Sequence, residues 1–416
     1  MVADLHENTH TFFVSANAKR DELKAEYMAR SGINLTRLLI STEPLVRQAT
    51  APLIQMMTQR TPPQLPVWEY ATEALSMFSD LEGATAAATQ IGLDLGSAEG
   101  LGNAGGSFEI LACAENRKIN VNSPLALQGE HARQSVASQV FSLLGGYQSP
   151  SPYDPLFSGR DADGQFSSRL NIVGDIVDWW DFDQQATNFD PGARTVTSAG
   201  SEDNVYQSLK DPYQSKNAPF DSLEELRLVR GFSDEFWATF VSPKPENPCE
   251  DLMTVYGTGS LNPNMAKPEA MLATLCSYIS DQPLCLDTME GAKFVQLVNT
   301  VRGMFPIPWF SSATDFVNFV EGKGNQNDLF PTLKSFLGED PSLLFRPVTI
   351  NQDVRKNLEA AFTTESYLIL IQSTGSAGRS RVSIRSVVNF HNRWAPPPPN
   401  TAVMPATGVI QYWRVN

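Results

Sequence analysis

The chain has 416 residues, two to three times the length of a usual domain, so we expect two or three packed units. Hydrophobic residues make up 42% and charged residues 19%, a balance that supports packed cores and excludes a disordered chain. Lys and Arg total 31 against 46 Asp and Glu, and the net charge of −15 argues against nucleic acid as a partner. Four histidines leave little material for a mechanism that needs several imidazoles.

The first part of the chain is predicted to be a long helix. From Ala18 to Met57 apolar residues recur at helical intervals, and Pro44 is expected to kink or break the helix. HENTH at His6–His10 has the HExxH spacing of zinc proteases, but its place beside a chain end favours a polar tail. No run reaches the roughly 18 apolar residues of a membrane span. The abrupt start indicates that an upstream segment is missing.

Residues 93–107 are rich in Gly, Ala and Ser and are predicted to form a loop. GLGNAG within it fits GxGxxG, but the SFEILACAE that follows has the pattern of a strand. A dinucleotide site needs a strand before the glycines and a helix after them. We therefore do not expect a dinucleotide cofactor.

From Ser123 to about Leu344 the apolar spacing is mostly helical, in short pieces separated by Pro, Gly and Asn. Around the RGF sequence the pattern predicts a helix, a tight turn and a second helix. Ser222 and Glu225 have the spacing of a capping box, Gly231 fits a left-handed helix end, and Ser233 can cap the next helix.

After Thr363 the hydrophobic period changes to two. SYLILIQST and RSRVSIRSVVNF are predicted to form a hairpin joined by GSAG, with Val382 and Ile384 on one face. WAPPPPN is an extended edge or loop, and VIQYWRV can add a last strand. A helical domain inserted into a small sheet is therefore the expected architecture.

Four cysteines allow three pairings if all are bridged. A Cys276–Cys285 bridge would close a short loop across SYISDQPL. Four buried thiols are the alternative. No CxxC spacing is present, so neither redox catalysis nor a zinc ribbon is supported.

The densest acidic run is DIVDWWDFDQQATNFD. With the residues just after it, the run supplies Asp175, Asp178, Asp181, Asp183, Asp190, Glu202 and Asp203. Two like charges 4 Å apart repel by about 1 kcal/mol in water and about 4 kcal/mol at an effective dielectric of 20, so a converging cluster needs a cation. Oxygen ligands favour calcium, and the i, i+2 spacing of Asp181 and Asp183 can present two side chains to one ion. The EF-hand pattern fails, because the sixth and twelfth positions are Ala186 and Gly192. A solvated acidic loop remains the alternative.

The sequence gives little support for a catalytic function. Two of these carboxylates could act as an acid and a base, as in glycosidases, but no GxSxG elbow and no GxxxxGK loop is present. The RGF unit is similar to a DNA-binding helix-hairpin-helix, but Asp234 and Glu235 would face the phosphates. We expect a protein that is not an enzyme.

Several segments, in this order, resemble the type II secretion minor pseudopilin K (GspK) family. They are KAEYMARSGINLTRLLI, GSFEILACAENRKINVNSP, VDWWDFD with SAGSEDNVY, KNAPFDSLEELRLVRGF and LMTVYGTGSLNPNMAKPEAMLATL. The resemblance implies an α+β, pilin-like fold: a long N-terminal helix on a small antiparallel sheet, with a large inserted helical domain of SAM-like or helix-hairpin-helix-like build. We expect the core in residues 1–122 and 346–416, and the inserted domain in 123–252 and 253–345.

The resemblance also implies calcium in the helical domain. By position, Asp181, Asp183, Glu202 and Asp203 are the first candidates for its ligands, with Asp178 and Asn217 as further ones. SAGSED departs from the GAED-like form usual in the family, and the spacer from Gln184 to Ala199 is long.

The implied function is that of a minor pseudopilin at the tip of the type II secretion pseudopilus. Its partners would be the I- and J-type minor pseudopilins, and it would initiate or cap the filament for protein export. The implied location is the periplasm, with anchoring in the inner membrane by an N-terminal helix absent from this chain. The alternatives are a calcium-dependent periplasmic binding or hydrolytic protein, a type IV minor pilin, and a DNA-uptake adaptor.

Overall fold

The computed structural model describes residues 2–58, 61–76, 106–122, 129–160, 167–207, 209–304, 308–324, 329–337, 344–391 and 407–416. The chain forms two compact units. Unit 1 comprises Met1–Ala49, Leu65–Ala114 and Tyr367–Asn416, and unit 2 comprises Thr50–Gln64 and Glu115–Ser366. The chain thus leaves unit 1 after Ala49, returns at Leu65, leaves again after Ala114 and returns at Tyr367, whereas we expected one insertion between residues 122 and 346. The division of the inserted part near residue 252 stays a prediction.

The N-terminal helix is longer than the apolar pattern indicated. α1 covers Val2–Ser41 and α2 covers Glu43–Thr58, so the predicted break near Pro44 is confirmed, two residues before the proline. Proline lacks a backbone N–H, and the start of a helix tolerates that loss. HENTH is part of the α1 backbone, and the side chains of His6 and Glu7 lie outside the described residues.

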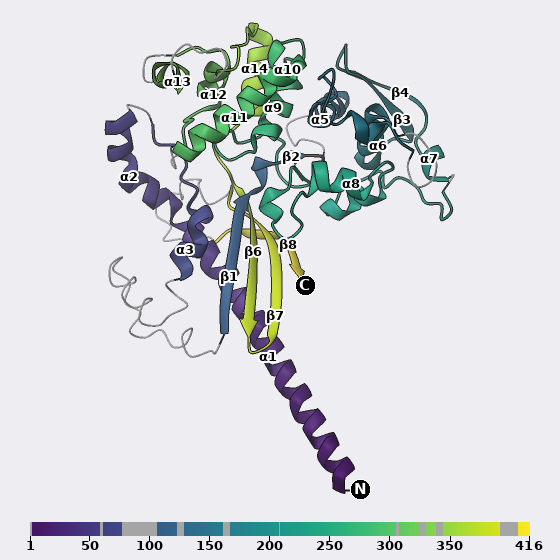
Figure 1. Ribbon diagram of the computed structural model, residues 1–416, viewed down its shortest axis with the longest axis vertical. Coiled ribbons are helices and arrows are strands. Elements are labelled where there is room, and N and C mark those ends of the chain that lie inside the picture. Colours follow the sequence, from purple (N-terminus) through teal and green to yellow (C-terminus); the bar gives the residue numbers. More distant parts are fainter. Residues whose placement is uncertain are drawn as a thin grey trace, which may run out of the picture. The chain divides into compact units, whose positions relative to one another are not determined.

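Unit 1 contains a four-stranded antiparallel sheet in the order β1-β6-β7-β8 (Figure 1). The strands are β1 (Gly106–Ala114), β6 (Leu368–Ala377), β7 (Ser380–Asn389) and β8 (Val409–Val415). The predicted hairpin is present, but GSAG is not its loop. β6 continues to Ala377, and the turn is Gly378 with Arg379. Gly378 has φ of 58°, the left-handed conformation that a two-residue hairpin turn requires.

α1 packs on β6, β7 and β1, and its N-terminal half extends beyond the ends of these strands (Figure 1). Ala25, Ala29 and Ile33 are fully buried in this contact. A Cβ atom on Gly375 of β6 would lie 1.9 Å from the Ala25 carbonyl oxygen, so only glycine permits this close approach. The predicted long helix on an antiparallel sheet, in a mixed α and β fold, is confirmed.

Unit 2 is mainly helical and surrounds one hydrophobic core that runs from Ile119 to Phe362. Its longer helices are α5 (Glu130–Leu143), α6 (Arg169–Trp180), α9 (Pro268–Cys276), α11 (Thr288–Met304), α12 (Ala313–Val320), α13 (Leu329–Leu337) and α14 (Gln352–Ala361). Two short strands, β2 (Ile119–Asn120) and β5 (Met253–Thr254), pair in parallel. Within the described residues, no helix is long and apolar enough to span a membrane.

The acidic segment after α6 forms a hairpin instead of the expected loop. β3 (Gln185–Asp190) and β4 (Thr195–Ser201) pair antiparallel. The strands are polar because most of their side chains face solvent, with Phe189 and Val196 buried. The long spacer between the acidic residues is therefore ordered as two strands.

The RGF unit is present with altered caps. Its first helix is a 3₁₀ helix, Leu223–Leu228, and Ser222 makes no side-chain cap. Glu225 instead accepts a hydrogen bond from the Asp221 backbone N–H at 3.0 Å, so the predicted capping box is wrong. Gly231 is left-handed, with φ of 87°. Ser233 caps α8 (Asp234–Phe236) as predicted.

The predicted Cys276–Cys285 disulfide is confirmed, with nine residues of sequence separation. It joins the end of α9 to α10 (Pro283–Leu286). Cys113 and Cys249 are disulfide-bonded as well, so the chain has no free thiol.

Candidate metal centre

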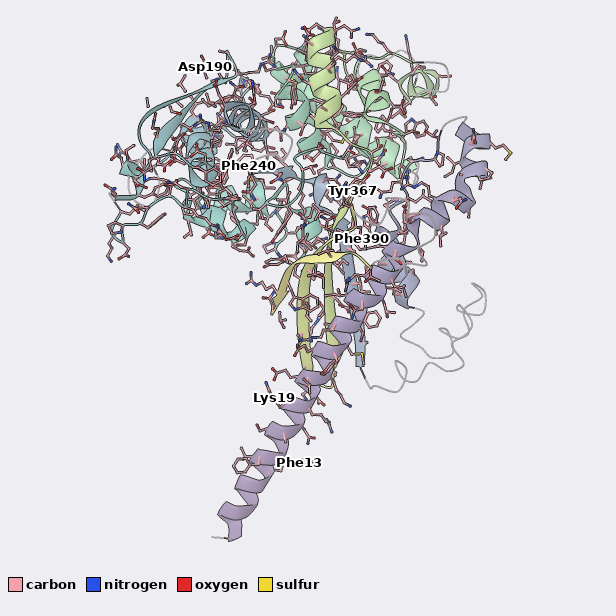
Figure 2. All side chains as sticks on the ribbon, turned by 180° about the vertical axis from the view of Figure 1, so that it is seen from behind. Phe13, Lys19, Asp190, Phe240, Tyr367 and Phe390 are labelled. Atoms are coloured by element: carbon pink, nitrogen blue, oxygen red, sulfur yellow. A yellow bond between two sulfur atoms is a disulfide. The ribbon has the colours of Figure 1, made fainter. Side chains whose placement is uncertain are left out.

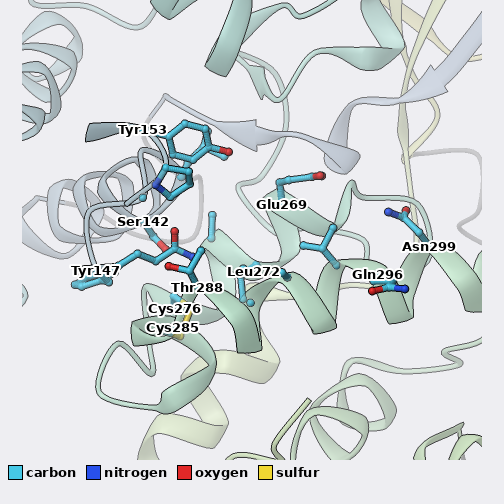
Figure 3. Close-up of a pocket in the computed structure, with 18 of the residues that line it drawn as sticks. Ser142, Tyr147, Tyr153, Glu269, Leu272, Cys276, Cys285, Thr288, Gln296 and Asn299 are labelled. Atoms are coloured by element: carbon cyan, nitrogen blue, oxygen red, sulfur yellow. A yellow bond between two sulfur atoms is a disulfide. The ribbon is translucent and has the colours of Figure 1, made fainter. Parts of the chain in front are cut away.

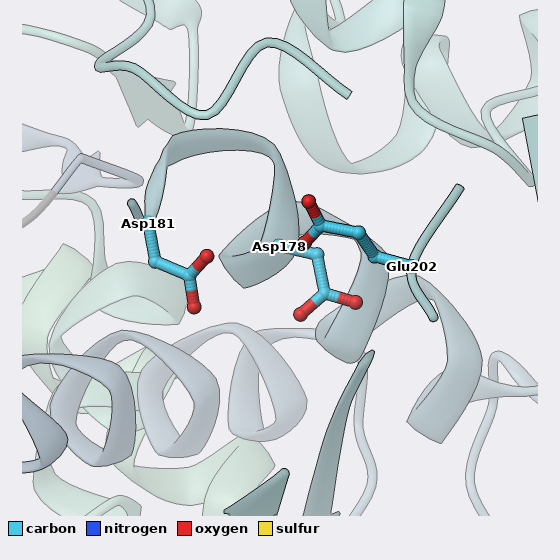
Figure 4. A group of neighbouring side chains, drawn as sticks. All are labelled: Asp178, Asp181 and Glu202. Atoms are coloured by element: carbon cyan, nitrogen blue, oxygen red, sulfur yellow. The ribbon is translucent and has the colours of Figure 1, made fainter. Parts of the chain in front are cut away.

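Three carboxylates of the acidic segment converge inside unit 2. Asp178, Asp181 and Glu202 each offer an oxygen, and these oxygens lie within 4.8 Å of one another. Figure 4 shows the carboxylate of Asp178 next to that of Glu202, with Asp181 on the other side of the helix end. We call this group the carboxylate triad. Asp181 and Glu202 were among the first candidates from the sequence, and Asp178 was a further one.

The local fold explains the convergence. Asp178 lies in the last turn of α6, and Asp181 ends this helix in an extended conformation, with its N–H bonded to the Val177 carbonyl. Glu202 follows β4, and the hairpin register pairs Gln185 with Ser201. The hairpin therefore returns the chain to the end of α6, where Glu202 meets the two aspartates.

The triad is buried, and two of its carboxylate oxygens accept no hydrogen bond from the described residues. Asp178, Asp181 and Glu202 expose 3%, 5% and 2% of their surface. Asp181 Oδ1 and Glu202 Oε2 accept no hydrogen bond from any residue that the structure describes. A buried carboxylate oxygen without a donor is costly, and such an atom in a native fold commonly marks an ion or an ordered water.

The neighbouring donors satisfy only part of the triad. The Thr187 N–H donates to Asp178 Oδ1 at 2.8 Å, and the Ser215 hydroxyl donates to Glu202 Oε1 at 2.8 Å. Arg133 Nη1, from α5, lies 3.3 Å from Asp181 Oδ2. The same nitrogen is closer to Asp183 Oδ2, at 2.9 Å, so this guanidinium is shared between two carboxylates.

The electrostatics show that the triad lacks positive charge. Burial raises the pKa of Asp178 to about 8. Burial also raises the pKa of Asp181 to about 6; the charge of Asp183 adds to this effect and the contact with Arg133 opposes it. The pKa of Glu202 is raised as well, mainly by burial. Without a cation, Asp178 is therefore expected to hold a proton near neutral pH.

The other predicted ligands lie next to the triad. Asp183 has a half-exposed side chain that pairs with Arg133 and accepts from the Gln185 N–H at 2.8 Å. The Ser215 hydroxyl lies 3.3 Å from Asp203 Oδ1 and 3.1 Å from Asn217 Oδ1. One hydroxyl proton serves one acceptor at a time, so this hydroxyl cannot donate to Glu202 and to these two oxygens together; Asp203 Oδ1 also accepts from the Ser215 backbone N–H at 3.1 Å.

The residues present fit a hard divalent cation. All the side-chain atoms that could act as metal ligands are oxygens. Ca²⁺ takes six to eight oxygen ligands from carboxylates, amides, carbonyls and water. Two of the buried triad oxygens have no other partner among the described residues. The unmatched oxygens and the raised pKa values together make the triad a candidate calcium site.

A polar cavity of about 540 Å³ adjoins this site and is lined by Asp175, Asp178, Thr187 and Arg230 among others. Asp175 and Asp178 are three residues apart on α6, so they are neighbours on one helix face. A glycosidase needs two carboxylates that flank a bond from different sides. Both carboxylates of the cavity come from the same helix.

A second hollow of about 560 Å³ lies along α9 and α11 and includes the Cys276–Cys285 disulfide (Figure 3). Tyr153 and Glu269 lie on one part of its wall, and Gln296 and Asn299 lie along α11. Glu269 is the charged residue in this lining. The hollow is otherwise a mixture of amides, hydroxyls and small apolar side chains, and it contributes nothing to the metal centre.

Sequence reasoning missed Arg133, Thr187 and Ser215. Arg133 lies 48 residues before Asp181, and nothing in its local sequence shows that α5 lies beside the acidic segment. The sequence did contain a turn signal for the hairpin that carries Thr187. Asp190, Pro191 and Gly192 form a turn sequence between two runs in which buried Phe189 and Val196 alternate with exposed residues.

Comparison with known proteins agrees with the resemblance. A family model described as "Type II secretion system (T2SS), protein K" matches residues 164–241, which include the whole carboxylate triad. A solved chain from the GspK-GspI-GspJ complex of the enterotoxigenic Escherichia coli type 2 secretion system is similar at 12% identity, with a TM-score of 0.43. The similarity covers 75% of this chain and 80% of that chain. A search of the curated proteins found no match. The predicted resemblance to the type II secretion protein K family is thus confirmed over residues 164–241.

Proposed function

We propose that this protein is the K-type minor pseudopilin of a type II secretion system. It assembles with I- and J-type minor pseudopilins at the tip of a periplasmic pseudopilus, where it initiates or caps the filament for protein export. In this proposal it is anchored in the inner membrane by a helix that precedes α1. The family match over residues 164–241 carries the proposal.

The exposed face of α1 supports an assembly role. Phe12 and Tyr27 expose 74% and 60% of their surface, and Phe13, Leu23 and Leu38 are also exposed. At 3.6 residues per turn, these five apolar side chains fall within about 100° of one another around the helix axis. The buried residues Ala25, Ala29 and Ile33 lie on the other side of the helix, against the sheet. Figure 2 shows Phe13 on the part of α1 beyond the strands.

We call these five residues, Phe12, Phe13, Leu23, Tyr27 and Leu38, the α1 stripe. The stripe can bury apolar surface against the helices of neighbouring subunits, at about 25 cal/mol per Å² removed from water. Such association needs no covalent chemistry. If further subunits can bind to this protein on one side only, the protein forms an end of the filament, which is the capping role proposed here.

Calcium belongs to the same proposal. Asp178, Asp181 and Glu202 would hold the ion, with Asp203 and Asn217 beside it at Ser215. When bound, the ion supplies positive charge that the described side chains around the triad do not. Because the triad joins the end of α6 to the end of β4, its residues would then fix the hairpin against the helix.

The assembly role can be tested with purified I- and J-type minor pseudopilins. Light scattering should detect a complex with this chain, and Tyr27→Lys should weaken it at least tenfold, because a charge is placed in the middle of the apolar stripe. Val14→Lys is the matched control. Val14 is also exposed and apolar, but it lies about 100° or more from every residue of the stripe around the axis.

The melting temperature should be the same for both variants, because both positions are exposed. If neither partner binds the wild-type chain, the proposed function is wrong. If Tyr27→Lys and Val14→Lys bind equally well, the proposed interface is wrong even though assembly occurs.

A further inference from the structure

The buried triad raises the question of how an ion reaches it. All three carboxylates expose 5% of their surface or less, so a cation in solution does not meet them directly. We propose that the polar cavity beside α6 is the route by which calcium reaches the triad, and that Asp175 is the residue that attracts the ion into it. This inference rests on the proposed calcium site.

The cavity touches the triad at one residue. Its volume is about 540 Å³, and Asp178 belongs both to its lining and to the triad. Thr187, whose N–H donates to Asp178 Oδ1, lines it as well. An ion in the cavity is therefore next to a triad carboxylate before it is fully enclosed.

The charges in the cavity decide what can enter it. Asp175, Asp178 and Arg230 are its charged residues, and the remaining polar side chains are neutral, including three asparagines. Arg230 acts electrostatically on Asp175 and donates to the Val205 carbonyl at 2.9 Å. Burial raises the pKa of Asp175 to about 7, and above this pH its carboxylate offsets the charge of the Arg230 guanidinium, which would otherwise repel cations from the cavity.

The Asp181 side of the triad, which does not line the cavity, is in contact with a positive charge. Arg133 contacts Asp181 and Asp183 there, at 3.3 Å and 2.9 Å. A calcium ion approaching from that side would meet a guanidinium already bound to the carboxylates. The cavity side, with Asp175 one helical turn before Asp178, is therefore the favourable approach.

The rate of ion uptake tests the proposal. Tb³⁺ replaces Ca²⁺ at oxygen sites, and Trp179 and Trp180 lie in the sequence between Asp178 and Asp181, so tryptophan excitation should report a bound Tb³⁺. In stopped-flow mixing, Asp175→Asn should lower the association rate constant by about three- to tenfold, with a smaller effect at high salt. The dissociation rate should change little, because Asp175 is not a member of the triad.

Three variants make the result specific. Asp281→Asn removes the same charge from an exposed loop outside the cavity and should leave the association rate unchanged. Asp175→Glu keeps the charge and should restore the rate, whereas Arg230→Gln should raise it. These opposite signs also separate an electrostatic effect from partial misfolding.

An unchanged association rate for Asp175→Asn, or a larger loss for Asp183→Asn, would show that the ion enters elsewhere. Absence of tryptophan-sensitised Tb³⁺ emission in the wild-type protein would instead remove the metal site, and the route with it. Thus failure of the route and failure of the proposed site give different results.

Discussion

Calcium should raise the melting temperature of this protein, and Glu202→Gln should remove that rise. Glu202 is 2% exposed, and its Oε2 accepts no hydrogen bond from the described residues. Because the triad is assembled only when α6 and the β3–β4 hairpin are folded, the ion binds the native state and not the unfolded chain.

The size of the effect follows from linkage. At a free calcium concentration one hundred times the dissociation constant, binding adds about 2.7 kcal/mol to the free energy of unfolding. For a unit of 150–250 residues or somewhat more, each kcal/mol raises the melting temperature by about 2–4 °C. The expected rise is therefore about 5–11 °C.

Scanning calorimetry after treatment with a chelator, and again with calcium, measures this rise. Glu202→Gln keeps the shape of the side chain but removes one buried negative charge. Without calcium the variant should melt at the same temperature as the wild type or higher, because the carboxylates repel one another less. Asp281→Asn should keep the full calcium-dependent rise, because Asp281 is exposed and outside the triad.

Two results would refute the reasoning. A wild-type melting temperature that is independent of calcium would show that the triad holds no ion. An undiminished rise in Glu202→Gln would show that calcium binds elsewhere on this acidic chain.

Three further predictions concern pH, the disulfide and the packing of α1. Burial raises the pKa of Asp178 from 3.8 to about 8. Without calcium, the contribution of its proton to the free energy of unfolding is therefore fully present below pH 4 and is lost as the pH rises through 8. The calcium-dependent rise in melting temperature should be larger at pH 8 than at pH 5, because calcium binds the ionised carboxylate. Cys276 and Cys285 are nine residues apart in the sequence, and replacing both by serine removes the bridge that closes this loop. The free energy of unfolding, measured with a denaturant, should fall by about 2.5 kcal/mol. Gly375→Ala should destabilise unit 1 by about 1–3 kcal/mol or more, because its Cβ would lie 1.9 Å from a backbone oxygen of α1, whereas Gly303→Ala, with open space around it, should not.

The hairpin of unit 1 was predictable because burial alternates along the first part of β7. Val382 and Ile384 are buried while Arg381 faces solvent, and this alternation is the pattern that identifies a strand in a sequence. The loop of the hairpin was misplaced because Gly375 was interpreted as a turn residue. Its actual role is to let α1 approach β6, which is a tertiary requirement that a local pattern does not reveal.

The β3–β4 hairpin was missed for the opposite reason. Its strands contain Gln, Asn and Asp, residues that are depleted in strands, and most of their side chains are exposed. Phe189 and Val196 are the only buried apolar residues of the two strands, which is too few to establish a period. The turn residues Pro191 and Gly192 were the stronger signal.

The candidate site was predictable in composition but not in arrangement. The i, i+2 spacing of Asp181 and Asp183 does place both carboxylates near one positive charge, but that charge is Arg133 of α5. Asp178 joins the triad because it precedes Asp181 by one turn of α6. The distance along the chain between Arg133 and these residues hides the contact from any reading of the local sequence.

Three kinds of positive charge could balance the triad: Arg133, protons or a metal ion. Arg133 is shared with Asp183, so it balances at most one of four neighbouring carboxylates. A proton on Asp178 removes one more charge, and only below a pH of about 8. Neither gives a partner to both Asp181 Oδ1 and Glu202 Oε2, which lie on residues from opposite ends of the hairpin. A single cation held by the triad would supply positive charge to both carboxylates at once, and for this reason we prefer an ion to a proton as the proposed occupant of the site.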